Sequence, residues 1–229
     1  MASTHTELGS NRERMAHGYD LYAGTDDDAA LALLSAAEHG HLTVWDGEAR
    51  RPSTIFMHYV TRVAEREIWG HLANTNPVLR RLETDPHATF TVSGPSAYVP
   101  SYFSGEERGV PTSYYSWGQF QVEVALVRDH ADLLTILEAM LARFQPEGRH
   151  PPMDPADRYW QGMLNAITGV RMHIRTAASR AKYGQNKPTR TRHLIVEALR
   201  QRGLAQDAAA ADQVLAHLPP EDPSDAPTR

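Results

Sequence analysis

Apolar and polar residues along this chain alternate, or recur at helical spacing, in a succession of short segments. Residues 41–60 give two such runs on either side of Asp46-Gly47, a pattern that predicts a strand, a turn and a second strand. Similar patterns predict further strands over 64–72, 88–103, 114–129 and 169–184. Regular short strands separated by turn signals are typical of a small antiparallel barrel.

Helical patterns lie between and after these strands. In residues 25–40, Thr25 is the expected N-cap, acidic residues fill the first turn and Gly40 ends the helix. Residues 130–146 carry apolar side chains on one face. Further helices are expected over 76–86, 157–168 and 189–203, the last of them ended by Gly203. Helices outside a block of strands predict an α+β fold.

The polar ends of the chain suggest how it is organised. We expect a flexible N-terminus over residues 1–18 and one domain over 19–203, including the helices after the last strand. Residues 204–229 are expected to form an Ala-rich helical turn followed by a disordered tail.

Composition excludes several kinds of chemistry. The 229 residues carry a net charge of −5 and no cysteine, so disulfides, thiolate metal sites and thiol nucleophiles are excluded. The polar start is unlike a secretory signal, and no apolar run approaches the roughly 18 residues of a membrane helix. We therefore expect a cytoplasmic protein with no membrane contact, in which 12 histidines are the available neutral nitrogen ligands.

The stretch STIFMHYV (53–60) is apolar, aromatic and β-branched, which predicts a buried strand with His58 inside it. A histidine in such a place is either a core residue hydrogen-bonded to a neighbour or a ligand to a metal or cofactor. The residues alone leave both readings open.

Three further segments, WGHLANTNPVLRRL (69–82), SGPSAYVPSYF with VPTSYY (93–115) and AKYGQNKP (181–188), occur in an order and spacing that resemble the PaiB family of FMN-binding negative transcriptional regulators. The resemblance spans roughly residues 20 to 200. It implies an FMN-binding split β-barrel, antiparallel and Greek-key-like, with peripheral helices. It also implies a homodimer with cofactor pockets at the subunit interface.

The chain departs from this family at residues 55–58. Family members carry a His-Leu-Pro-Leu segment there, whereas this chain has Ile-Phe-Met-His, which places a histidine three residues later. The PaiB-like piperazate synthases bind haem in place of FMN and convert N5-hydroxy-L-ornithine to L-piperazic acid by forming an N–N bond. The resemblance to this branch implies a haem b cofactor, with FMN as the alternative, and a small amino-acid substrate.

The resemblance also implies roles for particular residues. His58 is the expected axial ligand of the iron, because His71 belongs to the motif shared with members that bind no haem. His71, Asn74, Asn76, Arg80 and Lys187 are expected to contact the cofactor. The alternatives are a strand-end role for His71, helix capping for the two asparagines, and solvated positions for Arg80 and Lys187.

Tyr98, Tyr114 and Lys182 are the candidates for proton transfer in the cyclisation, and the sequence does not choose among them. Basic residues also gather over 175–192, which raises the alternative of a DNA-binding regulator. The acidic net charge and the lack of a helix-turn-helix pattern argue against a nucleic-acid partner.

Overall fold

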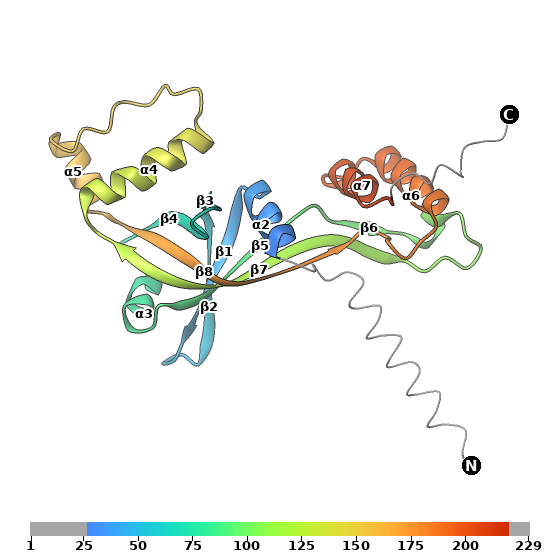
Figure 1. Ribbon diagram of the computed structural model, residues 1–229, viewed down its shortest axis with the longest axis horizontal. Helices are drawn as coiled ribbons and strands as arrows, with labels where there is room; N and C mark the ends of the chain where they lie inside the picture. The colour runs from blue at the N-terminus through green and yellow to red at the C-terminus, as the bar shows by residue number, and fades with distance from the viewer. Residues whose placement is uncertain (1–26, 220–229) are drawn as a thin grey trace, which may run out of the picture. The chain divides into compact units, whose positions relative to one another are not determined.

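A computed structural model describes residues 27–219 of the chain as an α+β protein with an eight-stranded antiparallel sheet (Figure 1). The strands are β1 (His39–Asp46), β2 (Arg51–His58), β3 (Val60–Arg62), β4 (Glu67–Ala73), β5 (His87–Ser93), β6 (Ala97–Val99), β7 (Thr112–Val127) and β8 (Ile167–Lys182). The helices are α2 (Asp27–Ala36), α3 (Val78–Thr84), the 3-10 helix η1 (Ser101–Ser104), α4 (His130–Phe144), α5 (Arg158–Leu164), α6 (Thr189–Arg202) and α7 (Asp207–Ala216).

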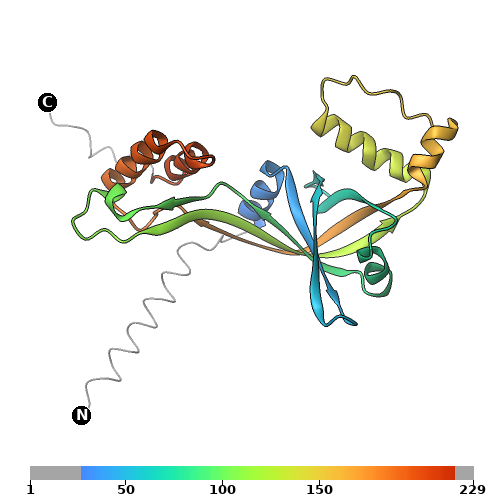
Figure 2. The ribbon, with the colours of Figure 1, turned by 180° about the vertical axis from the view of Figure 1, so that it is seen from behind.

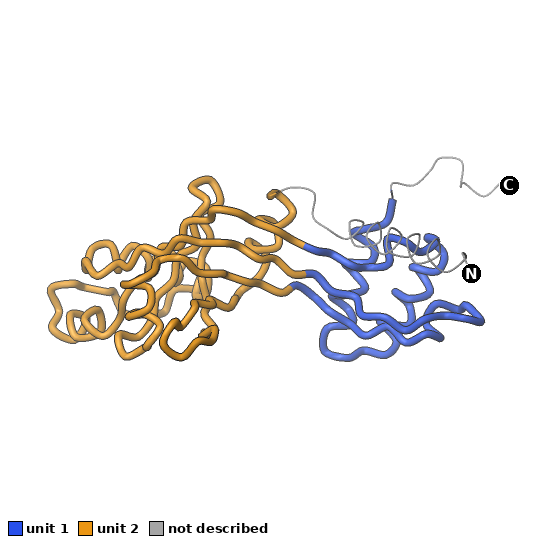
Figure 3. The backbone as a smooth tube through the Cα atoms, turned by 90° about the horizontal axis from the view of Figure 1, so that it is seen from below, with its two compact units in different colours: residues 1–25, 94–116, 180–229 blue, residues 26–93, 117–179 orange. Residues whose placement is uncertain are grey.

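The chain divides into two compact units (Figure 3). Unit 1 comprises residues 1–25, 94–116 and 180–229, and unit 2 comprises residues 26–93 and 117–179. Strands β7 and β8 contribute residues to both units. The expected single domain over 19–203 includes parts of both units, and its boundaries stay a prediction.

Unit 2 contains most of the sheet, in which seven strands follow the order β2-β1-β5-β7-β8-β4-β3 and the eighth, β6, pairs with β7 off this path. The hairpin of β1 and β2, drawn in blue and cyan in Figure 2, pairs His39 with His58 and His41 with Phe56. Because side chains alternate along a strand, these four residues share one face of the hairpin. Leu42, Val44 and Met57 lie on the other face and are buried.

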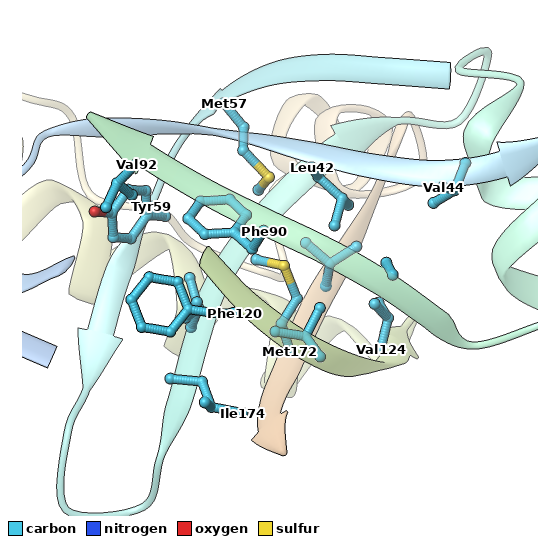
Figure 4. Close-up of a cluster of buried hydrophobic side chains, with 14 of the residues drawn as sticks. Leu42, Val44, Met57, Tyr59, Phe90, Val92, Phe120, Val124, Met172 and Ile174 are labelled. Carbon is cyan, nitrogen blue, oxygen red and sulfur yellow. The ribbon is translucent and has the colours of Figure 1, made fainter. Parts of the chain in front are cut away.

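The core of unit 2 lies on this inner face of the sheet (Figure 4). Phe90 and Phe120, partners across β5 and β7, are fully buried there together with Met172 of β8. Tyr59 is buried too, and its hydroxyl donates a 2.6 Å hydrogen bond to the carbonyl oxygen of Leu34 in α2. Burial raises the pKa of Tyr59, so its hydroxyl acts as a structural donor.

Unit 1 has a core of its own, in which β6 and the first part of β7 pack with α6 and α7 (Figure 1). Ile195 and Leu199 of α6 and Val214 of α7 are fully buried. Arg202 closes this unit by bonding to both carboxylate oxygens of the buried Asp207 at 2.7 and 2.6 Å. This pair lowers the pKa of the Asp207 carboxyl.

Most expected elements are present, with differences that have physical reasons. Gly203 ends α6 in the left-handed conformation at φ 65°, as expected. The expectation that residues 53–60 form a buried strand is wrong, because β2 lies at the end of the sheet order and one of its faces is open. Phe56 is 56% exposed there. The residues expected to form only a helical turn include the ten-residue helix α7.

Several expectations concern residues that the structure does not describe. Thr25 as an N-cap, the flexible segment 1–18 and the tail after Pro219 lie outside the described residues. No helix within residues 27–219 has the length and apolar character needed to cross a membrane.

Candidate functional site

His58 lies at the end of β2, on the open face of the β1–β2 hairpin. Its Nδ1 is 3.1 Å from the backbone carbonyl oxygen of Glu38, in the connection between α2 and β1. A carbonyl oxygen only accepts, so Nδ1 must carry the proton in this hydrogen bond. The Nε2 of the neutral ring then holds a lone pair. In metal-ligating histidines, one ring nitrogen binds the metal and the N–H of the other commonly donates to a backbone carbonyl.

Aromatic rings surround the His58 imidazole. The ring centroids of Phe56 and Phe144 lie 5.3 and 5.2 Å from it, and that of His39 lies at 6.2 Å. Phe144 belongs to α4, so a helix far away in the sequence completes this part of unit 2. A ligating nitrogen bordered by aromatic rings suits a flat, apolar cofactor.

Arg143, next to Phe144 in α4, ties that helix to the end of α2 and to the α2–β1 connection. Its Nη2 donates to the carbonyl oxygens of Ser35 and Ala37 at 3.1 and 2.7 Å. Its guanidinium carbon lies 5.4 Å from the centroid of the Phe144 ring. Sequence reasoning missed Arg143, because only the tertiary structure brings residue 143 to the α2–β1 connection.

His71, in β4, also packs against α4 but in a different environment. Its Nδ1 lies 3.4 Å from the sulfur of Met140. Burial lowers the pKa of His71, because the charged ring loses hydration there and gains no acidic partner in its place. A neutral histidine beside a thioether matches a packing role at least as well as a cofactor contact.

The two histidines contact α4 at Met140 and Phe144, four residues apart and so about 6 Å along the helix axis. Gly70 allows this close approach of β4 to the end of β2. A Cβ at residue 70 would meet the Met57 methyl at 2.3 Å and the His58 carbonyl oxygen at 3.2 Å. His58 and His71 therefore contact the same helix, and their roles toward a cofactor stay a prediction.

The remaining residues expected to contact the cofactor in unit 2 have structural partners. The Nδ2 of Asn74 donates to the Asn165 carbonyl oxygen at 2.8 Å. The Oδ1 of Asn74 accepts from the Thr168 hydroxyl at 2.6 Å. Asn76, the residue before the N-cap Pro77 of α3, accepts from the backbone N–H of Val78 at 3.0 Å and so bonds to the first turn of that helix. Arg80 is exposed on α3. A cofactor contact by these three residues stays a prediction.

The other expected site residues lie in unit 1, where Tyr114, Lys182 and Lys187 line one pocket of about 350 Å³. Lys182 donates to the Thr112 hydroxyl at 2.7 Å. Lys187 lies 3.7 Å from the Glu106 carboxylate. The structure brings these three residues to one pocket, and the roles expected of them toward substrate and cofactor stay a prediction.

Tyr98 is separated from this group by the alternation of the β6–β7 pair. Tyr114 pairs with Ala97 and faces the core, whereas Tyr98 pairs with Ser113 and is 58% exposed. Of the three candidates for proton transfer, Tyr114 and Lys182 share a pocket and Tyr98 faces away from it.

Within the described residues, no three or more histidine or acidic side chains are arranged to hold a metal ion. A bare metal centre therefore has no ligand set in this part of the chain. Haem makes a smaller demand, because its macrocycle supplies four of the ligands and the protein needs one axial donor.

The fold defines the class of protein. Residues 19–176 match the family model described as "Putative FMN-binding domain", which covers more than half of the chain. The chain therefore belongs to this FMN-binding family, and its fold is the split barrel that the sequence led us to expect. No curated protein matches the chain.

Solved structures with the same fold have little sequence in common with this chain. The flavocytochrome Anf3 from Azotobacter vinelandii has a TM-score of 0.54 and 15% identity over 72% of this chain and 71% of its own. The FAD and haem binding protein from Mycobacterium smegmatis has a TM-score of 0.52 and 15% identity over 71% and 74%. A conserved hypothetical protein from Mycobacterium tuberculosis has 0.52 and 17% over 73% and 91%. At these identities the likeness shows the fold.

Proposed function

We propose that this protein binds haem b on the open face of the β1–β2 hairpin, with the Nε2 of His58 as the axial ligand. We further propose that the loaded protein converts N5-hydroxy-L-ornithine to L-piperazic acid. The observation that carries the cofactor proposal is the hydrogen bond from His58 Nδ1 to the Glu38 carbonyl oxygen, which orients Nε2 as the donor. The substrate rests on the resemblance to the piperazate synthases.

The surroundings of His58 fit such a group. Phe56 and Phe144 offer ring surfaces for a macrocycle. Arg143 has guanidinium N–H groups beyond those that hold the Ser35 and Ala37 carbonyls, and these suit a propionate. The open face of the hairpin also fits the expected homodimer, in which a second copy would shield the cofactor from water.

Two structural neighbours are described as binding flavin or haem, namely the FAD and haem binding protein and the flavocytochrome. They support the compatibility of this fold with both cofactors. The family model favours FMN as the alternative cofactor, which would make the protein a flavin-dependent oxidoreductase or a PaiB-like regulator.

The proposed reaction is balanced without an added oxidant. The bond between N2 and N5 forms, the N5–O bond breaks, the α-amine gives up a proton and water leaves. Bound haem would supply a Lewis acid for the departing oxygen. The chain must hold the flexible substrate folded, which brings N2 to N5 and accounts for much of the acceleration.

The first experiment is a visible spectrum of the purified protein after separate reconstitution with haemin and with FMN. We expect a sharp Soret band for the wild type and its loss in His58→Ala, with an unchanged circular dichroism spectrum because His58 is exposed. Added imidazole should restore the band in His58→Ala. The matched variant His71→Ala should keep the band, and the assay with N5-hydroxy-L-ornithine then tests turnover.

Other spectra would contradict the proposal. Flavin bands without haem uptake would leave the FMN alternative and make His58 a surface residue of a flavoprotein. A Soret band that survives in His58→Ala but not in His71→Ala would move the axial ligand to β4. Haem binding without conversion of N5-hydroxy-L-ornithine would remove the cyclase while keeping the cofactor.

A further inference from the structure

The pocket of unit 1 has its own chemistry, independent of His58. It has a volume of about 350 Å³ and lies between the segment 106–112 and the turn 182–187, both within unit 1. This volume is in the range of small-molecule binding sites. Four charged side chains line it, namely Glu106, Arg108, Lys182 and Lys187.

Local hydrogen bonds fix the wall that carries Glu106 and Arg108. The Ser104 hydroxyl donates to the Ser101 carbonyl at 2.8 Å and accepts from the backbone N–H of Glu106 at 3.2 Å. The N–H of Gly109 donates to the Glu106 carbonyl at 3.2 Å. A Cβ at Gly109 would lie 2.3 Å from the Ser101 carbonyl oxygen, so this loop packs tightly onto η1. Its charged side chains are thus presented from a defined backbone.

The opposite wall is a tight turn. Gly184 has a φ of 79°, and its backbone passes so close to Tyr114 that a Cβ would meet the hydroxyl at 2.2 Å. Gln185 bonds to the Tyr183 N–H at 2.8 Å and to the Ala181 carbonyl at 2.7 Å. The N–H of Lys187 donates to the Gly184 carbonyl at 2.8 Å. The turn therefore positions Lys187, whose side chain is only 19% exposed.

The described residues that line this pocket include more basic than acidic side chains. Among the described residues that line it, three are cations and one is a carboxylate, a set that favours an anionic group. Lys187 and Glu106 are 3.7 Å apart, longer than a charge-assisted hydrogen bond, which leaves both able to bond to a ligand. A ligand with a carboxylate next to an ammonium group would satisfy both signs of charge.

We propose that this pocket binds a free α-amino acid, with Arg108 and Lys187 holding its carboxylate and Glu106 holding its ammonium group. Lys182 is oriented by the Thr112 hydroxyl and adds a third positive charge. The site goes beyond the proposed function, because it lies within unit 1 and its binding chemistry requires no haem.

The test uses a matched pair of probes, L-norvaline and pentanoate, which differ only by the α-amine. We would titrate each into the full-length protein without added cofactor by isothermal calorimetry. Arg108→Ala should weaken L-norvaline binding about tenfold or more, as expected for the loss of a hydrogen bond between charged groups. Arg190→Ala removes an exposed arginine outside the pocket from the same unit and should leave the affinity unchanged.

Glu106→Gln gives the sharpest contrast, because the two probes should respond in opposite directions. L-norvaline should bind more weakly once its ammonium group loses the carboxylate, and pentanoate should bind more tightly once a repelling charge is gone. Changes of the same sign, or no binding of L-norvaline to the wild type, would overturn the amino-acid site. Displacement of L-norvaline by inorganic phosphate at lower concentration would also overturn it in favour of a phosphate site.

The two proposals fail separately. Loss of the amino-acid site leaves the Soret band of the wild type and its absence in His58→Ala as they are. If the protein takes up only FMN, the haem proposal fails. The affinities of L-norvaline and pentanoate should still change in opposite directions in Glu106→Gln.

Discussion

The open face of the β1–β2 hairpin and the pocket of unit 1 present their ligating groups in different ways. On the hairpin, one imidazole is oriented by a backbone carbonyl and bordered by aromatic rings. In the pocket, four charged side chains of the described residues project from a loop and a turn whose backbones are fixed by glycines and local hydrogen bonds. The site proposed for a flat cofactor thus depends on sheet pairing, and the one proposed for a zwitterion depends on tight turns.

The largest effect is expected from a substitution in the turn of unit 1. Gly184→Ala would force a side chain into a left-handed residue and against the Tyr114 hydroxyl. We expect a loss of about 2–4 kcal/mol in the free energy of unfolding, measured by urea denaturation. The same substitution at the exposed Gly162 of α5, where a Cβ would meet nothing within 4 Å, should stabilise by about 0.5–1 kcal/mol. Equal effects at the two positions would show that the turn is not tightly constrained.

The two histidines that pack on α4 can be separated by pH. Burial holds the pKa of His71 in the folded protein below the pKa of a histidine in the unfolded chain. As the pH falls through the pKa of the unfolded chain, the unfolded state therefore binds more protons than the folded state. Stability contributed by neutral His71 is therefore complete above about pH 6.5 and is lost as the pH falls below it. His71→Gln should make the stability of the protein less dependent on pH between 7 and 5, as followed by thermal unfolding. An unchanged pH profile would contradict this assignment.

The aromatic border of His58 gives the smallest effect on stability. Phe56→Ala removes a side chain that is 56% exposed, so the free energy of unfolding should change by no more than about 0.5 kcal/mol. Haem affinity, measured by titration of the Soret band, should fall severalfold if the ring contacts the macrocycle. An unchanged affinity would place the cofactor away from Phe56 and weaken the role given to this face.

Much of the fold could be predicted from local patterns in the sequence. The hairpin around Asp46-Gly47, the long strand β7 and the helix ended by Gly203 all follow from alternation, spacing and glycine chemistry. Lys182 and Lys187 of the motif at 181–188 line the same pocket, and the roles expected of them stay a prediction. These features depend on residues close together in the sequence.

The exposure of β2 could not be predicted from local sequence patterns. An apolar, β-branched stretch has the same composition in a central strand and in one at the end of a sheet, and only the strand order shows that β2 has an open face. Arg143 and Arg108 were missed for a related reason. Arginines on a helix and in a loop give no local signal, and their roles arise from contacts with distant segments.

The sequence by itself therefore determined the order of elements, the absence of thiol chemistry and the identity of His58 as an unusual residue, because each depends on local composition and periodicity. The tertiary structure decided which face His58 occupies, which of its nitrogens is engaged, and which charged residues meet in unit 1. These outcomes depend on strand order and long-range packing, which bring together residues that have no fixed relation along the chain.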